Sequence, residues 1–463
     1  MPSAQSIGAG VRCQPACDES TAARREVGRW AATFSATVSA TVSATISALR
    51  CGPTSNLAPL TMPITYSAAT ADGRTVSYRD RKRAWWSLSV VFPLLPLLGL
   101  YAHYVTGYAL ALGVPLLISY GLLPLLDALI GEDHNNPPEA VVPQLDDDRY
   151  YRWLTWAAVP LHFVSLITCA WWAGTHDLPG WALVLLAYVI GTTGGLGLNT
   201  AHELGHKHNA LEQWLARLVL AVPAYGHFTV EHGRGHHRDV ATPQDCASSR
   251  MGESIYRFAL RELPGGIRRA WRLEGVRLRG LGHSAFSRHN TMLQSYAITA
   301  VLQLGLVAAF GWVMLPFLAI HNVVAWWQLT SANYVEHYGL LRQREASGRY
   351  ESPKPWHSWN TNHLVTNLVT FHLQRHSDHH AYPSRRYQCL RDFPDLPTLP
   401  SGYFGMFLVA YIPWLWFRLM DPRLLALPQV QGRLDRVNLC PVAHDALWAR
   451  YGPATAPAST SSA

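Results

Sequence analysis

The sequence is poor in charged residues. Asp, Glu, Lys and Arg make up 15% of the 463 residues, whereas a soluble globular protein carries roughly 25%. Apolar residues account for 49% of the chain, and there are 18 Trp and 20 Tyr, the two residue types that gather where a membrane meets water. The shortage of charge argues against an ordinary soluble domain and indicates an integral membrane protein.

Cysteine is scarce as well. The seven cysteines include one close pair, Cys13 and Cys17, whose spacing fits neither a zinc ribbon nor a CxxC redox pair. We therefore expect unpaired thiols in a reducing compartment. Also missing is a stripe of Lys and Arg interleaved with aromatic residues, which a nucleic-acid-binding protein needs.

The N-terminal segment, residues 1–61, has a composition unlike that of the rest of the chain. It contains the near-repeat SATVSATVSATISA at 35–48 and several Arg, but no apolar run that could form a span or a secretory signal. We interpret it as a disordered tail or as an over-extended start, with true initiation at Met62. We expect a membrane domain at 62–423 and a C-terminal tail at 424–463.

Six apolar segments after Met62 predict transmembrane helices, since a helix needs about 20 residues to cross the hydrocarbon core. They are 85–105, 108–130, 153–173, 181–200, 295–310 and 313–329, and the last two form a hairpin broken near Gly311. A seventh apolar segment, 404–419, is expected to lie in the membrane interface or to pack on the polar part of the chain. The predicted fold class is thus all-α and integral to a membrane.

The basic residues predict the orientation of these helices. A basic cluster that includes Arg79 and Arg83 precedes the first span, and the positive-inside rule places it in the cytoplasm. The second, fourth and sixth spans then end on that side. The long loop there is rich in arginine and carries eight between residues 250 and 279: Arg250, Arg257, Arg261, Arg268, Arg269, Arg272, Arg277 and Arg279. We therefore predict a helical cytoplasmic cap that carries the polar chemistry.

Nine histidines occur in four groups near the predicted membrane boundary. Residues four apart on a helix share one face, so two imidazoles can bind one metal ion. A third histidine at the adjacent position points sideways and can reach a second ion, which favours a dinuclear site. Imidazole ligands suit iron, copper, nickel and zinc. The groups are His202 and His206; His232, His236 and His237; His337; and His376, His379 and His380.

Each histidine group also contains carboxylates. A carboxylate beside a metal ligand can accept the outer ring N–H of the imidazole and thereby fix its tautomer. We assign this role to five residues, although a solvated or structural role is equally open for any one of them. They are Glu203, Glu231, Asp239, Glu336 and Asp378.

Several segments around these histidines closely resemble the bacterial membrane alkane 1-monooxygenases, a histidine-rich membrane di-iron family. The segments are NTAHELGHK, EHGRGHHRDVATPQD, NYVEHYG and LQRHSDHH. NYVEHYG and LQRHSDHH separate this family from the acyl desaturases and sterol oxidases, which share looser histidine motifs. The resemblance covers roughly residues 62–423 and, matched motif by motif, implies that all nine histidines bind two iron ions.

The resemblance also implies a reaction and partners. The family hydroxylates the terminal methyl group of n-alkanes to primary alcohols with O2, in the bacterial inner membrane, with the active site on the cytoplasmic face. The implied electron donor is rubredoxin, reduced in turn by an NAD(P)H-dependent rubredoxin reductase. The chain lacks the two cysteine pairs of a fused rubredoxin, so the donor is expected to be a separate protein.

Two further predictions concern substrate and donor. We expect the first four spans to line an apolar substrate channel, with Tyr101 as a candidate lining residue, although an interfacial or packing role is equally open. Exposed arginines near the histidines are expected to form a docking surface for an acidic rubredoxin. These are Arg234, Arg238, Arg375, Arg385 and Arg386.

Other functions stay open from the residues alone. HELGH matches the HExxH signature of zinc proteases, in which Glu203 would act with His202 and His206. A related membrane di-iron enzyme acting on fatty acids or aromatic methyl groups, either a hydroxylase or a desaturase, is a second alternative. A metal-binding or transport protein without turnover is a third.

Overall fold

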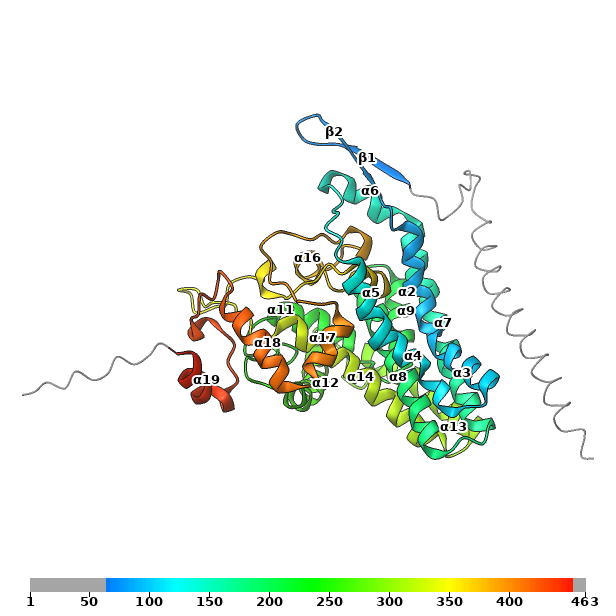
Figure 1. Ribbon diagram of the computed structural model, residues 1–463. Coiled ribbons are helices and arrows are strands. Elements are labelled where there is room, and N and C mark those ends of the chain that lie inside the picture. The colour runs from blue at the N-terminus through cyan, green and yellow to red at the C-terminus, as the bar shows by residue number, and fades with distance from the viewer. Residues whose placement is uncertain (1–63, 453–463) are drawn as a thin grey trace, which may run out of the picture. The chain divides into compact units, whose positions relative to one another are not determined.

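The computed structural model describes residues 64–452, which Figure 1 shows from the N-terminal hairpin in blue to the C-terminal helices in red. Five helices are long and apolar enough to cross a membrane. They are Arg83–Thr106, which ends with α3 (Leu95–Thr106); Ala109–Ile130, which includes α4 (Val114–Leu117) and α5 (Leu123–Ile130); α7 (Arg149–Thr175); α8 (Gly180–Gly205); and α13 (Thr291–Phe310). The multi-pass membrane fold is thereby confirmed, and residues 1–61 lie outside the described range.

The sixth predicted span is present as a helix but is less apolar. α14 (Met314–His337) is 24 residues long and follows α13 after a break at Gly311, whose φ of +82° suits glycine. It is not among the five apolar helices. Its buried polar residues, His321, Asn322 and Gln328 among them, lower its mean hydropathy.

α14 packs in parallel against α8. A Cβ on Gly191 of α8 would lie 2.7 Å from Val324 Cβ, and one on Gly194 would lie 3.1 Å from Ala325 Cβ. Glycine at these positions lets the two backbones approach closely, as small residues do between membrane helices. The two helices end together, so His202 of α8 and His337 of α14 reach the same region.

The apolar segment 404–419 forms two short helices, α17 (Tyr403–Ala410) and α18 (Pro413–Leu425), bent by 118° relative to one another. α17 buries Met406 and Phe407 in the same core cluster as Tyr334 of α14. This fits the predicted packing on the polar part of the chain better than a straight span.

Most of the polar part of the chain is also helical, and side-chain caps fix several helix starts. Asn209 caps α9 (Ala210–Ala221), Ser254 caps α12 (Ile255–Gly280) and Asn290 caps α13, each accepting a backbone N–H. The remaining elements near the histidines are short. They are α10 (Phe228–Glu231), the π-helical turn η6 (His232–His236), α11 (His237–Asp239), α15 (Leu364–Val369) and α16 (His376–Ala381).

Two regions differ from the sequence-based expectation. An antiparallel hairpin, β1 (Thr65–Ala69) and β2 (Thr75–Arg79), precedes the first span, and it was not predicted. The segment expected as a C-terminal tail, 424–463, contributes Leu424, Val430 and Leu447 to the core cluster that contains Tyr334. The folded unit therefore extends to at least α19 (His444–Tyr451).

Candidate metal centre

All nine predicted histidines come together at the ends of α8 and α14. They form two groups in which the potential ligand nitrogens lie within 4.8 Å of one another. We call these the five-histidine group and the four-histidine group. The five-histidine group is His202, His206, His232, His237 and His379; the four-histidine group is His236, His337, His376 and His380.

Adjacent histidines belong to different groups, as the sequence pattern predicted. His236 and His237 are split between the groups, and so are His379 and His380. The spacing of four residues fails once, however, because His232 shares a group with His237 and not with His236. The reason is local: η6 is a π-helical turn, in which residues five apart lie on one face.

The ring nitrogens converge as metal ligands do. His232 Nε2 lies 3.0 Å from His237 Nε2, and His376 Nε2 lies 3.0 Å from His380 Nε2. Further Nε2 atoms, those of His202 and His236 among them, are buried without a hydrogen-bond partner within residues 64–452. Such unsatisfied buried nitrogens are costly, and a bound cation would use their lone pairs. The residues present therefore fit a pair of metal ions.

Burial also keeps these rings neutral. For six of the histidines, burial, followed by the proximity of other basic groups, lowers the pKa well below its ordinary value. A neutral imidazole retains the nitrogen lone pair that a metal ion requires. The six are His206, His232, His237, His376, His379 and His380.

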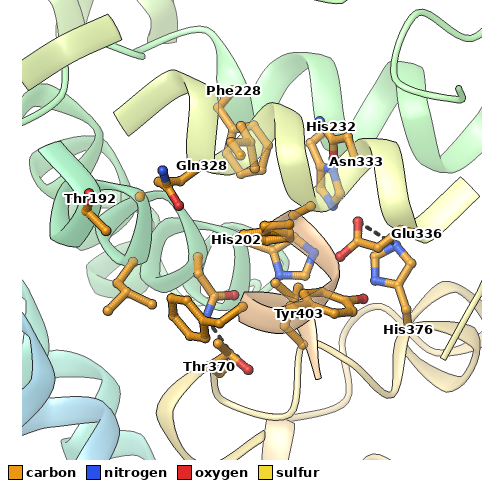
Figure 2. A pocket seen from close by; sticks show the side chains of 18 residues that line it. Thr192, His202, Phe228, His232, Gln328, Asn333, Glu336, Thr370, His376 and Tyr403 are labelled. Carbon is orange, nitrogen blue, oxygen red and sulfur yellow. Dashed lines mark hydrogen bonds and ion pairs between the residues drawn. The ribbon is translucent and has the colours of Figure 1, made fainter. Parts of the chain in front are cut away.

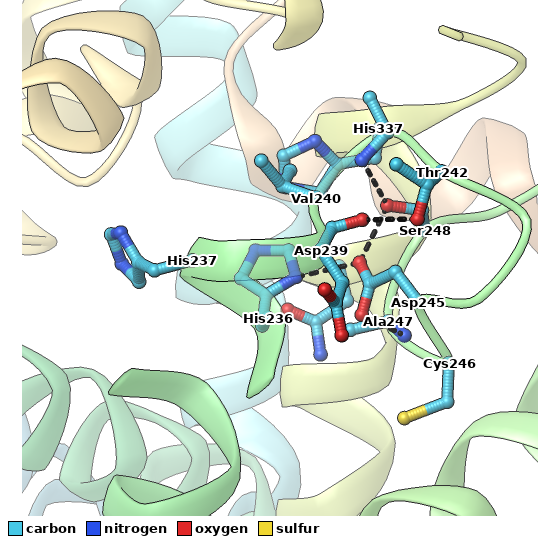
Figure 3. A network of polar contacts seen from close by, with 12 residues as sticks. His236, His237, Asp239, Val240, Thr242, Asp245, Cys246, Ala247, Ser248 and His337 are labelled. Atoms are coloured by element: carbon cyan, nitrogen blue, oxygen red, sulfur yellow. Dashed lines mark hydrogen bonds and ion pairs between the residues drawn. The ribbon is translucent and has the colours of Figure 1, made fainter. Parts of the chain in front are cut away.

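Asp245, which the sequence analysis missed, supports the four-histidine group from outside (Figure 3). His236 Nδ1 donates to Asp245 Oδ2 at 2.8 Å, and Ser248 Oγ donates to the same carboxylate at 2.6 Å. His337 Nδ1 donates to the backbone carbonyl of His357 at 3.2 Å. Asp245 lies within the EHGRGHHRDVATPQD segment, but no spacing rule distinguishes it there from Asp239.

The five predicted carboxylates do not take this supporting role. Glu336 Oε2 lies 3.4 Å from His376 Nε2, which is the nitrogen facing the four-histidine group and not the outer one. The other four carboxylates pair with basic side chains instead. The pairs are Glu203 with Lys207, Glu231 with Arg269, Asp239 with Arg238, and Asp378 with Arg385.

A narrow, largely apolar pocket reaches both histidine groups. Figure 2 shows His202 and His232 of the five-histidine group and His376 of the four-histidine group at its wall. Apolar side chains, Leu196 and Phe404 among them, line much of the rest. An apolar molecule held there would lie directly beside the imidazoles.

The position of the pocket differs from the predicted channel. Most of its walls come from α8, α14, α17 and the 370–373 segment, and α10, η6 and α16 add Phe228, His232 and His376. Among the first four spans, α8 is the only contributor. Tyr101 does not line the pocket. Its side chain is 64% exposed on the outward side of α3, which fits a lipid-facing position and not a place beside this cavity.

The predicted arginine surface is largely internal. Arg375, Arg385 and Arg386 are buried, and each forms ion pairs within the fold. Only Arg234 and Arg238 have substantially exposed side chains. Two arginines alone do not make the docking surface that the sequence suggested.

Comparisons with known proteins agree with this geometry. The fatty acid desaturase family model matches residues 179–418. An alkane 1-monooxygenase of Pseudomonas putida is 56% identical over 375 residues, covering 81% of this chain and 92% of that protein. Alkane 1-monooxygenase 1 of Alcanivorax borkumensis is 54% identical over 372 residues, covering 80% and 91%.

A more distant relative is the xylene/toluene monooxygenase hydroxylase component of Pseudomonas putida. It is 26% identical, over 71% of this chain and 86% of that protein. The identity to the two alkane 1-monooxygenases named above is twice as high and extends over more of the chain. Together with the nine converging histidines and the membrane helices, this similarity shows that the chain belongs to the alkane 1-monooxygenase family.

Proposed function

We propose that this protein hydroxylates the terminal methyl group of n-alkanes to primary alcohols, using O2 and electrons from rubredoxin. The observation that carries the proposal is the apolar pocket that ends on histidines of both groups. The names of the relatives support the substrate class.

The nine histidines would hold two iron ions, four or five imidazoles to each. Iron fits a donor set made of neutral imidazoles, and such a set disfavours magnesium and calcium. When bound, the iron pair would supply the activation of O2, which protein side chains cannot perform. The role of the chain is to hold the ions, to place the substrate and to exclude water.

The pocket explains how a substrate without a polar group is positioned. An n-alkane offers no hydrogen bond, so its binding depends on contact with side chains such as Leu196, Phe404 and Phe407. Because the histidines lie at the wall of the pocket, the end of the alkane that enters the pocket would lie beside the metal centre. Selectivity for the terminal carbon then follows from the shape of the pocket.

The side of the membrane and the electron donor are part of the same proposal. The arginine-rich helix α12 packs against α10 and η6, beside the histidines. The positive-inside rule therefore favours the cytoplasmic face of the inner membrane for the metal centre. A separate rubredoxin, reduced by its NAD(P)H-dependent reductase, would deliver electrons from that side.

An intramembrane zinc protease is disfavoured by the position of Glu203. In such an enzyme this glutamate would act as the general base on a metal-bound water. Here its carboxylate lies 3.0 Å from Lys207 Nζ and accepts the backbone N–H of Tyr387. Nine converging histidines are also many more than the three protein ligands of a catalytic zinc site.

The proposal is tested by incubating membranes that contain the full chain with medium-chain n-alkanes, rubredoxin, rubredoxin reductase and NADH. Products are identified by gas chromatography, and iron per chain is measured in parallel. We expect primary alcohols that appear only with rubredoxin, at two irons per chain.

Other outcomes would redirect the proposal. Two bound irons without any alcohol from alkanes would move the substrate to fatty acids or to aromatic methyl groups; one relative is a xylene/toluene monooxygenase component. One zinc ion per chain in place of iron would overturn the metal assignment. Absence of oxygen consumption with every substrate would leave a metal-binding protein without turnover.

A further inference from the structure

Helix α12 has two sharply different faces. It carries seven arginines in 26 residues. Three of them point into the protein and are paired with acidic side chains there. These pairs are Arg261 with Glu253, Arg269 with Glu231, and Arg277 with Glu274.

The other four arginines lie on the outward face. Arg257, Arg268, Arg272 and Arg279 are exposed, and none of them forms a salt bridge with any residue of the described range 64–452. Four unpaired guanidinium groups along a single helix make a strongly positive strip. Such a strip is suited to anionic groups outside the protein.

A row of exposed apolar side chains runs beside this strip. Tyr256, Leu260 and Ile267 are all exposed, Leu260 at 79%. At about 100° of rotation per residue, the three lie within a sector of about 40°, and the four arginines fill the adjacent sector. An apolar row flanked by arginines is the pattern of a helix that lies in a membrane interface.

α12 is joined by hydrogen bonds to one end of the apolar helix α13. Glu274 of α12 accepts the backbone N–H of Thr291 at 2.9 Å and its hydroxyl at 2.8 Å, and Thr291 is the first residue of the span α13. The far end of α13, at Phe310, packs on Gly174 near the end of α7. α12 is therefore attached to the end of α13 that lies on the side of the metal centre.

Neighbouring segments continue the apolar surface. Phe286, in the loop between α12 and α13, is 80% exposed. At the other end of the helix, Tyr256 Oη donates to the Tyr411 carbonyl at the bend between α17 and α18, where Trp414 is exposed. Exposed aromatic residues at both ends are typical of a membrane–water interface.

We propose that α12 lies in the plane of the membrane, on the side of the metal centre, and binds anionic phospholipids. Leu260 and Ile267 contact the acyl chains, while the four outward arginines bind lipid phosphate groups. The proposal does not depend on the reaction that the protein catalyses. It adds a structural connection, because Arg269 on the inner face of the same helix holds Asp245, the partner of His236.

The test uses the full chain at one copy per nanodisc. A Leu260→Cys variant and, independently, an Ile267→Cys variant carry an environment-sensitive NBD fluorophore, and dithionite in the water quenches any exposed label. The matched control is Ser347→Cys, an exposed position in the loop between α14 and α15. Wild-type chain labelled in parallel gives the background from native cysteines.

We expect blue-shifted emission and protection from dithionite at 260 and 267, and rapid, complete quenching at 347. Quenching at 260 and 267 as fast as at 347 would overturn the proposal, since the face would then lie in water. Protection that appears only when a disc holds more than one chain would also overturn it, in favour of a contact between copies.

A second experiment tests whether the outward arginines of α12 bind anionic lipid. In discs containing phosphatidylglycerol, protection at 260 is expected to exceed that in phosphatidylcholine alone, because each arginine near an anionic surface adds favourable energy. The double change Arg268→Gln and Arg272→Gln should abolish this difference, whereas Arg349→Gln, at an exposed site in the 347 loop, should not. Equal protection in both lipids, unchanged by the double change, would overturn the phosphate-binding part.

Discussion

The two histidine groups are held in different ways. The five-histidine group has one more donor, but none of its rings has a hydrogen bond from its outer nitrogen to another residue within 64–452. The four-histidine group has fewer donors, and two of them are fixed from outside, His236 by Asp245 and His337 by a backbone carbonyl. Because a hydrogen bond to the outer ring nitrogen raises metal affinity, we expect the fifth histidine of the one group to offset the hydrogen bonds that its rings lack.

The largest expected effect comes from removing a donor from each group. His337→Ala leaves three donors in its group, whereas His206→Ala leaves four. We expect His337→Ala to lose one iron per chain and to lower turnover more than about 100-fold, beyond the usual effect of an outer partner. His206→Ala should keep both ions and lose less activity. Equal metal loss in the two variants, measured by plasma mass spectrometry, would break the comparison.

The second largest effect is expected from the hydrogen bond that His236 donates to Asp245 through its outer ring nitrogen. Asp245→Asn removes the acceptor of His236 Nδ1–H as a charged group, and we expect metal affinity to fall about 10- to 100-fold. Glu203→Gln is the matched change near the five-histidine group, where the carboxylate pairs with Lys207 instead of a histidine. It should leave metal affinity unchanged. Competition with a chelator measures both; a comparable loss in Glu203→Gln would contradict this account.

The contact between α8 and α14 sets the distance between the groups, because α8 supplies only the five-histidine group and α14 only the four-histidine group. Gly191→Ala places a methyl group against Val324, and overpacking of this kind costs about 1–3 kcal/mol. We expect a lower melting temperature and weaker binding of both ions. Gly180→Ala, where a Cβ meets open space, is the control and should change neither.

A smaller effect, on the pH dependence of stability, is expected from a buried carboxyl group between α12 and α14. Glu262 of α12 accepts hydrogen bonds from Thr330 and Asn333 of α14. Burial outweighs these bonds and raises the pKa of Glu262 from 4.5 to about 7. The folded state thus retains a proton that the unfolded chain releases, so this contribution to stability is complete below pH 4.5 and is lost as the pH rises through 7.

Glu262→Gln cannot ionise and should therefore keep that contribution at high pH. The melting temperature of the wild-type protein is expected to fall relative to the variant between pH 5 and 8. Each unit of pKa shift corresponds to about 1.4 kcal/mol, so the effect is measurable by thermal unfolding. Exposed Glu345→Gln is the control. Parallel melting curves for wild type and Glu262→Gln across this range would refute the assignment.

The histidines themselves were predictable, because their spacing and adjacency carry the chemistry in the sequence. Five of the six spans were also predictable from the length of their apolar runs alone. The sixth, α14, is less apolar than a free-standing span because it buries polar residues such as Asn322 and Gln328.

Other features depend on contacts between distant segments, and neither residue spacing nor hydrophobic periodicity in the sequence indicates them. Asp245 becomes a partner of His236 only through the loop that returns after α11. The β1–β2 hairpin has strands of five residues, too short for periodicity to stand out. Carboxylates next to a histidine in sequence point elsewhere, as Glu203 does towards Lys207, because neighbours on a helix do not share a face.

The π-helical turn η6 has a consequence for how such a centre changes by mutation. A regular helical turn would bring His232 and His236 to one face and direct both to the same ion. The extra residue in the turn places His232 in the five-histidine group and His236 in the four-histidine group. Gly233 lies in this turn, and a side chain there would meet open space. The turn thus has room for change, and deletion of one residue from it would restore a regular helical turn and move a histidine from one group to the other.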